Sequence, residues 1–102
     1  MEAKKEKTED TTIGFKFDVL RTALSLTYEK AAKLLLLKTR EVSALKMQEN
    51  RYIRVKVLYA IYYFADATLK NPNKEEYVHN IAKDLKEACR AELATRRKKA
   101  GF

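Results

Sequence analysis

Residues 15–71 read FKFDVLRTALSLTYEKAAKLLLLKTREVSALKMQENRYIRVKVLYAIYYFADATLKN and contain neither glycine nor proline. The two glycines, Gly14 and Gly101, stand near the ends of the chain, and Pro72 is its single proline. Glycine and proline mark most tight turns, and a β-rich domain of this length would need many of them. The stretch therefore predicts an all-α fold, a small helical bundle whose turns do not use glycine.

Apolar residues recur at helical spacing from residue 15 to residue 38. A competing alternation of apolar and polar residues between Ile13 and Val19 is typical of a strand, but the helical stripe continues beyond it, so we favour a helix. Residues 39–47 extend the helical pattern. Both one long helix and two shorter ones are compatible with residues 15–47, because four consecutive leucines inside this stretch cannot all face one side of a helix.

The second half of the chain has clearer boundaries. Residues 52–69 are the most apolar segment and predict a mostly buried central helix, preceded by a break at residues 48–50. Asn71-Pro72-Asn73 predicts a turn, and residues 74–97 predict an amphipathic helix that follows it.

A short internal similarity suggests a doubled architecture. Residues 15–20 and 53–58 share the pattern apolar, basic, apolar, charged, Val, Leu. If this similarity reflects duplication, residues 15–49 and 53–97 form two pseudo-repeated helical hairpins, and such stacked pairs can leave a groove between them.

The length of the chain predicts one domain of ordinary size. Residues 1–11 are charged and lack apolar periodicity, so we expect a flexible charged arm, followed by a single helical domain over 12–97 and a basic tail over 98–102. No uncharged apolar stretch approaches the ~18 residues of a membrane span, and the polar start of the chain does not resemble a secretory signal. We therefore expect a cytoplasmic protein without a membrane partner.

Catalytic and cofactor chemistry has little support in the sequence. His79 is the only histidine, so a histidine-based metal cluster is excluded, and we expect its side chain to face solvent. Cys89 lies on the apolar stripe of the last predicted helix, where a buried structural thiol is expected. Two glycines cannot build a Gly-rich phosphate loop. We predict a non-enzymatic protein with no catalytic residue, no metal and no cofactor.

The net charge of +8 suggests an anionic partner, either nucleic acid, an acidic protein or a membrane surface, although solubility alone could account for it. The densest basic cluster comprises Arg96, Arg97, Lys98 and Lys99, although basic residues are favoured at any helix C-terminus by the helix dipole. If this cluster binds nucleic acid, it contacts phosphates and reads no sequence. Nonspecific nucleic-acid binding is therefore the alternative function.

Tyrosines and lysines along one face of the central helix provide the leading hypothesis. Tyr52, Lys56, Tyr59 and Tyr63 follow this face at helical spacing. Tyrosine is enriched in protein interfaces, although the same rings could instead lie in the core or stack on bases. We predict a protein–protein interaction module that binds a protein or peptide in a groove edged by these residues.

The sequence is short and rich in Lys, Glu and Tyr, and it has a two-part pattern. It also contains the runs Leu34–Leu37 and Tyr62-Tyr63. In these features and in size the chain resembles the small all-helical proteins of filamentous viruses of hyperthermophilic archaea. The resemblance implies a viral accessory or virion-associated role, in the host-cell cytoplasm or in the virion. It implies no particular site residue, partner identity or oligomeric state.

Overall fold

The computed structural model describes residues 12–99, and the predicted arm at residues 1–11 and the tail beyond Lys99 lie outside this range. The described residues form five α-helices and two short 3₁₀ helices, and they contain no strand. The elements are α2 (Ile13–Ala23), α3 (Tyr28–Leu35), α4 (Thr39–Ala44), η1 (Leu45–Met47), η2 (Asn50–Tyr52), α5 (Val55–Lys70) and α6 (Glu76–Lys99). The all-α prediction is confirmed for these residues.

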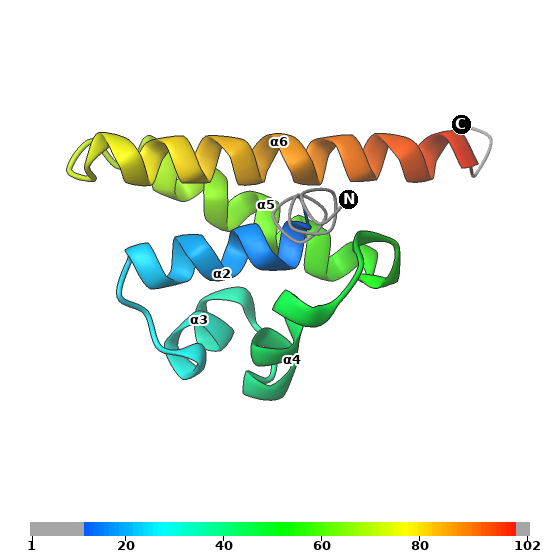
Figure 1. Cartoon of the computed structure of the whole chain (residues 1–102), viewed down its shortest axis with the longest axis horizontal. Coiled ribbons are helices and arrows are strands. Elements are labelled where there is room, and N and C mark those ends of the chain that lie inside the picture. The colour runs from blue at the N-terminus through cyan, green and yellow to red at the C-terminus, as the bar shows by residue number, and fades with distance from the viewer. Residues whose placement is uncertain (1–11, 100–102) are drawn as a thin grey trace, which may run out of the picture.

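Figure 1 shows the long helix α6 along one side of the molecule, α2 and α5 against it, and α3 and α4 on the far side of α2. Each α-helix contributes buried apolar side chains to one core. Phe17 of α2 and Phe64 of α5 meet edge to face there, with ring centroids 5.6 Å apart. At the rim of the core, Lys16 of α2 pairs with Asp84 of α6 at 2.5 Å.

The first part of the chain forms three short helices, so the prediction of unbroken helix over residues 15–38 is wrong at the turn after Ala23. Both α2 and α3 end in a Schellman motif, in which the residue after the helix adopts a left-handed conformation. Ser25 and Leu36 hold these positions, each with φ of 58°. In the second motif, the amides of Leu36 and Leu37 donate back to the carbonyls of Lys33 and Ala32. Because neither position is glycine, the residue type that usually marks such helix ends is missing from the sequence at both positions.

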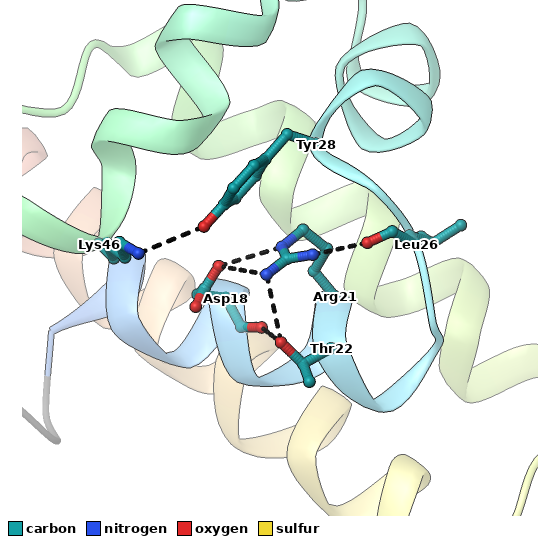
Figure 2. Close-up of polar contacts among 6 residues, drawn as sticks. All are labelled: Asp18, Arg21, Thr22, Leu26, Tyr28 and Lys46. Atoms are coloured by element: carbon teal, nitrogen blue, oxygen red, sulfur yellow. Dashed lines mark hydrogen bonds and ion pairs between the residues drawn. The ribbon is translucent and has the colours of Figure 1, made fainter.

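The turn after α2 is closed by a polar cluster around Arg21, shown in Figure 2. The Arg21 guanidinium pairs with Asp18 at 3.0 Å and donates to the Leu26 carbonyl at 2.6 Å. It also lies 4.1 Å from the centroid of the Tyr28 ring, whose hydroxyl accepts from Lys46 Nζ at 3.3 Å. The cluster thus joins α2, the turn, α3 and η1.

Two carboxylates connect helices elsewhere. Glu41 of α4 accepts from the Lys38 backbone amide at 3.0 Å and pairs with Arg54, which precedes α5. Asp66 of α5 accepts from Lys86 of α6 at 2.7 Å. The hydrogen bond from the Lys38 amide lowers the pKa of Glu41, and the hydrogen bond from Lys86 lowers the pKa of Asp66.

The doubled-hairpin architecture stays a prediction. Of the matched apolar positions, Leu20 and Leu58 are both buried, but Phe15 is exposed where Ile53 is buried. The first segment also contains α2, α3 and α4, whereas the second contains only α5 and α6 as α-helices. The predicted helices over 52–69 and 74–97 correspond closely to these last two helices.

Gly14 lies where α2 meets η1. A Cβ atom at this position would stand 1.8 Å from the Leu45 carbonyl oxygen, so no side chain fits without movement of one of the two backbones. Beside it, the Ile13 amide donates to Asn50 Oδ1 at 2.7 Å. The close approach therefore fixes the start of α2 against the segment that leads into α5.

We expect Gly14→Ala to lower the free energy of unfolding by about 3 kcal/mol, because the added methyl group overpacks a backbone contact that cannot relax cheaply. Chemical denaturation of the two proteins measures this difference. Val19→Ala, at an exposed position of the same helix, is the matched control and should change the value by less than about 0.5 kcal/mol. Equal effects of the two substitutions would contradict the close approach.

Candidate functional site

Three tyrosines of α5 form an aromatic cluster. The rings of Tyr59 and Tyr63, one turn apart, stack with centroids 6.3 Å apart and an angle of 23°. Tyr62 meets Tyr63 edge to face at 5.3 Å. The structure thus brings together two of the predicted site residues, Tyr59 and Tyr63. It adds Tyr62, which sequence reasoning missed although it lies three residues after Tyr59.

The other two predicted residues lie apart from this cluster. Tyr52 belongs to η2, is exposed, and has the Arg51 guanidinium 4.9 Å from its ring centroid. It lines a separate depression of about 220 Å³ against α4 and η1. Lys56 is exposed in the first turn of α5. The predicted face is therefore divided, and only its C-terminal part forms an aromatic cluster.

The aromatic cluster faces the C-terminal half of α6. A depression of about 280 Å³ is lined by Tyr59, Tyr62, Tyr63, Arg90, Leu93, Ala94 and Arg97, and we call this the tyrosine–arginine surface. A hydrogen bond with Tyr62 raises the pKa of Arg90, and Lys86 Nζ lies 5.6 Å from the Tyr62 ring centroid. Cations of α6 therefore place positive charge beside the rings.

The predicted basic cluster at the end of α6 is divided in the same way. Arg96 is half-buried, pairs with Glu92 at 3.0 Å, and donates to the Asn50 carbonyl at 2.8 Å. Arg97, Lys98 and Lys99 are exposed. Arg96 thus connects α6 to η2, whereas Arg97 reaches the tyrosine–arginine surface.

A second depression lies on the other side of Tyr63, between α3 and α5. It has a volume of about 340 Å³ and is lined by Leu34, Leu35, Leu36, Ala60, Tyr63, Phe64 and Ala67; we call it the leucine hollow. Leu34 is 62% exposed and Leu36 is 86% exposed. Because Tyr63 lines both depressions, the leucine hollow and the tyrosine–arginine surface adjoin each other.

Cys89 and His79 both make contacts within the fold. Cys89 is fully buried, and burial raises the pKa of its thiol to about 12, so it stays protonated at neutral pH. His79 is half-buried with Nε2 2.7 Å from the Asn71 carbonyl oxygen, which corrects the expectation that it faces solvent. Residues 12–99 contain no group of three His, Cys, Asp or Glu side chains that could hold a metal ion. None of their helices is both long and apolar enough to span a bilayer.

The different roles of the neighbouring arginines can be tested directly. We expect Arg96→Met to lower the free energy of unfolding by about 1–2 kcal/mol, because it removes charge-assisted hydrogen bonds to Glu92 and to the Asn50 carbonyl. Arg97→Met should change it by less than about 0.5 kcal/mol. Thermal and chemical denaturation of both variants measure the contrast, and similar losses would show that Arg96 does not connect α6 to η2.

No protein-family model, curated protein or solved structure matches this chain. No relative's activity, substrate or partner can therefore be transferred to it. Side chains of α3, α5 and α6, together with Leu36, line the two adjoining depressions.

Proposed function

We propose that this chain is a non-enzymatic protein–protein interaction module, and that it binds a protein or peptide across the tyrosine–arginine surface and the leucine hollow. The observation that carries the proposal is the position of Tyr63, which is 62% exposed and lines both depressions. Large apolar side chains that gather on a surface are typical of an interaction site. Here Leu34, Leu36 and Tyr63 gather in this way.

The composition of the surface supports the same function. Tyrosine and arginine are the residue types that, with tryptophan, most often dominate binding energies in protein interfaces. The rings of Tyr59, Tyr62 and Tyr63 already hold one another through stacked and edge-to-face contacts. Little side-chain entropy is then lost on binding, which favours affinity.

The predicted groove between residues 15–49 and 53–97 takes a definite form in this proposal. The leucine hollow lies between α3 of the first segment and α5 of the second, and it would serve as that groove whether or not the two segments arose by duplication. The resemblance to small proteins of archaeal filamentous viruses suggests the biological context in which the module would act. In that context the module is a viral accessory or virion-associated protein, acting in the host-cell cytoplasm or in the virion.

The test replaces the two stacked rings together. We expect Tyr59→Ala/Tyr63→Ala to reduce recovery of the protein's partners in pull-downs from native cells by about tenfold or more, a loss of about 1.4 kcal/mol in binding. Quantitative mass spectrometry compares the recovered proteins, and circular dichroism confirms that the fold is intact. Tyr77→Ala is the matched control, because Tyr77 is 54% exposed but lies at the opposite end of α6. Unchanged recovery with the double variant would refute the assignment of this surface.

A specific observation favours nonspecific nucleic-acid binding as the second candidate. Arg97, Lys98 and Lys99 are exposed and form no ion pair with another residue in the 12–99 range. Arg97 also adjoins aromatic rings of the kind on which bases can stack.

If this candidate is correct, gel-shift assays should show binding to single-stranded nucleic acid that weakens steeply with salt. Replacing Arg97, Lys98 and Lys99 by Gln should reduce the slope of log affinity against log salt by about 2, because three phosphate contacts are lost. Arg96 stays in place as the internal control, since it has a structural role. Absence of any shift at low salt would eliminate this candidate.

A further inference from the structure

Leucine at position 36 is unfavourable for the stability of the isolated protein in two respects. It occupies the left-handed position after α3, with φ of 58° and ψ of 42°, where glycine is the usual residue. It is also 86% exposed, the highest value among the exposed large apolar side chains of the described residues. The backbone position disfavours a leucine, and the side chain gains almost no burial in return.

Ser25 provides an internal comparison. It holds the equivalent position after α2 with the same φ of 58°, and the same pattern of backbone hydrogen bonds closes its turn. There the exposed side chain is small and polar, as expected for a residue that contacts only solvent. The fold therefore tolerates a polar residue in this motif, and a leucine at position 36 calls for another explanation.

We propose that Leu36 is the apolar contact residue of a docking site for an acidic amphipathic helix, which would lie across the leucine hollow and the tyrosine–arginine surface. This inference rests on the proposed function and names the partner of that site. Leu36 and Leu34 would pack against the apolar face of the partner, with Tyr63 between the two depressions.

A helical partner fits the available surface. Pairing of an added strand needs an exposed sheet edge, and residues 12–99 contain no sheet. Docking of a helix needs an apolar groove between helices, which α3 and α5 provide. Arg90 and Arg97 lie seven residues apart on α6, about two turns or ~10.5 Å. Carboxylates at positions i and i+7 of a partner helix have the same spacing.

Charge favours an acidic partner over a second copy of the chain. The protein carries a net charge of +8, Arg90 and Arg97 line the tyrosine–arginine surface, and Lys86 lies beside the Tyr62 ring. Asp66 pairs with Lys86, but Arg90 and Arg97 are exposed beside the rings. A symmetric dimer through this surface would place such charges near their own copies, which is unfavourable. Carboxylates on a partner would instead complement them.

The test uses a hydrocarbon-stapled helical peptide with leucines along one face and glutamates beside them, titrated into the full ¹⁵N-labelled chain. A second peptide carries lysines in place of the glutamates. We expect the glutamate peptide to shift resonances at the end of α3, at the α5 tyrosines and at Arg90 and Arg97, whereas the lysine peptide shifts none of them. Equal binding of both peptides, or shifts confined to another surface, would overturn the inference.

Substitution of Leu36 separates binding from folding. We expect Leu36→Gly to raise the melting temperature by a few degrees, because glycine adopts the left-handed conformation without strain, yet to weaken peptide binding about tenfold or more. Ser25→Gly should raise the melting temperature in the same way and leave peptide binding unchanged. Asparagine also tolerates this backbone conformation, so Leu36→Asn should weaken binding as Leu36→Gly does. It controls for the added backbone flexibility of glycine.

The outcomes distinguish this inference from the proposed function. Peptide binding that is lost in Tyr59→Ala/Tyr63→Ala but kept in Leu36→Gly would overturn the role of Leu36 and leave the interaction surface standing. If light scattering shows that the protein is a dimer and that Leu36→Gly makes it monomeric, the occupant of the site is a second copy of the chain, and the acidic helix is ruled out. A single-stranded oligonucleotide that shifts the same resonances, when the glutamate peptide does not, would overturn the acidic helix and the proposed function together.

Discussion

The contact between Gly14 and the Leu45 carbonyl is the constraint on which the arrangement of the helices depends. It brings the backbone of α2 directly against η1, a distance that only a residue without Cβ permits. Next to it, Asn50 accepts a hydrogen bond from the Ile13 amide through its side chain and another from Arg96 through its carbonyl. The start of α2, the segment before α5 and the last turns of α6 therefore meet around one residue.

This meeting point determines which side chains α6 presents at the tyrosine–arginine surface. Because Arg96 is drawn toward Asn50, the helix turns its neighbour Arg97 about 100° away, onto the side where the α5 tyrosines lie. Two adjacent arginines of the same sequence cluster thus have different surroundings: Arg96 packs against η2 and Arg97 is exposed at the surface. The tyrosine–arginine surface is a product of how α6 is fixed, and it depends on contacts well away from the rings themselves.

Sequence reasoning could predict the features that depend on local periodicity. The apolar period of α5 and α6 is strong and uninterrupted, so their existence and approximate ends were predictable, as was the all-α class. The ends of α2 and α3 were not, because Ser25 and Leu36 adopt a conformation that the surrounding structure imposes and that their types do not favour. The run of four leucines did carry a usable signal, since such a run cannot be buried on one helical face, and α3 ends at Leu35 within it.

The same distinction applies to the candidate site. The pairing of Tyr59 with Tyr63 follows from helical spacing and could be read from the sequence. The proximity of Arg90 on α6 and of Leu34 and Leu36 on α3 could not, because it depends on how three helices pack. For Tyr52 the helical spacing was misleading. The predicted helix placed this residue on the tyrosine face, but in the structure it belongs to η2, before α5 begins.

The carboxylates of Glu41 and Asp66 have a consequence for acidic conditions. Their hydrogen bonds hold both pKa values below the ordinary values of 4.5 and 3.8, so the unfolded chain takes up protons there before the folded one does. Their contribution to stability is present above those ordinary values and is lost only as the pH falls through the lower, folded values. The links from α4 to α5 and from α5 to α6 therefore persist as the pH falls toward those ordinary values. Moderate acidification thus leaves the helices that carry the tyrosines joined to their neighbours.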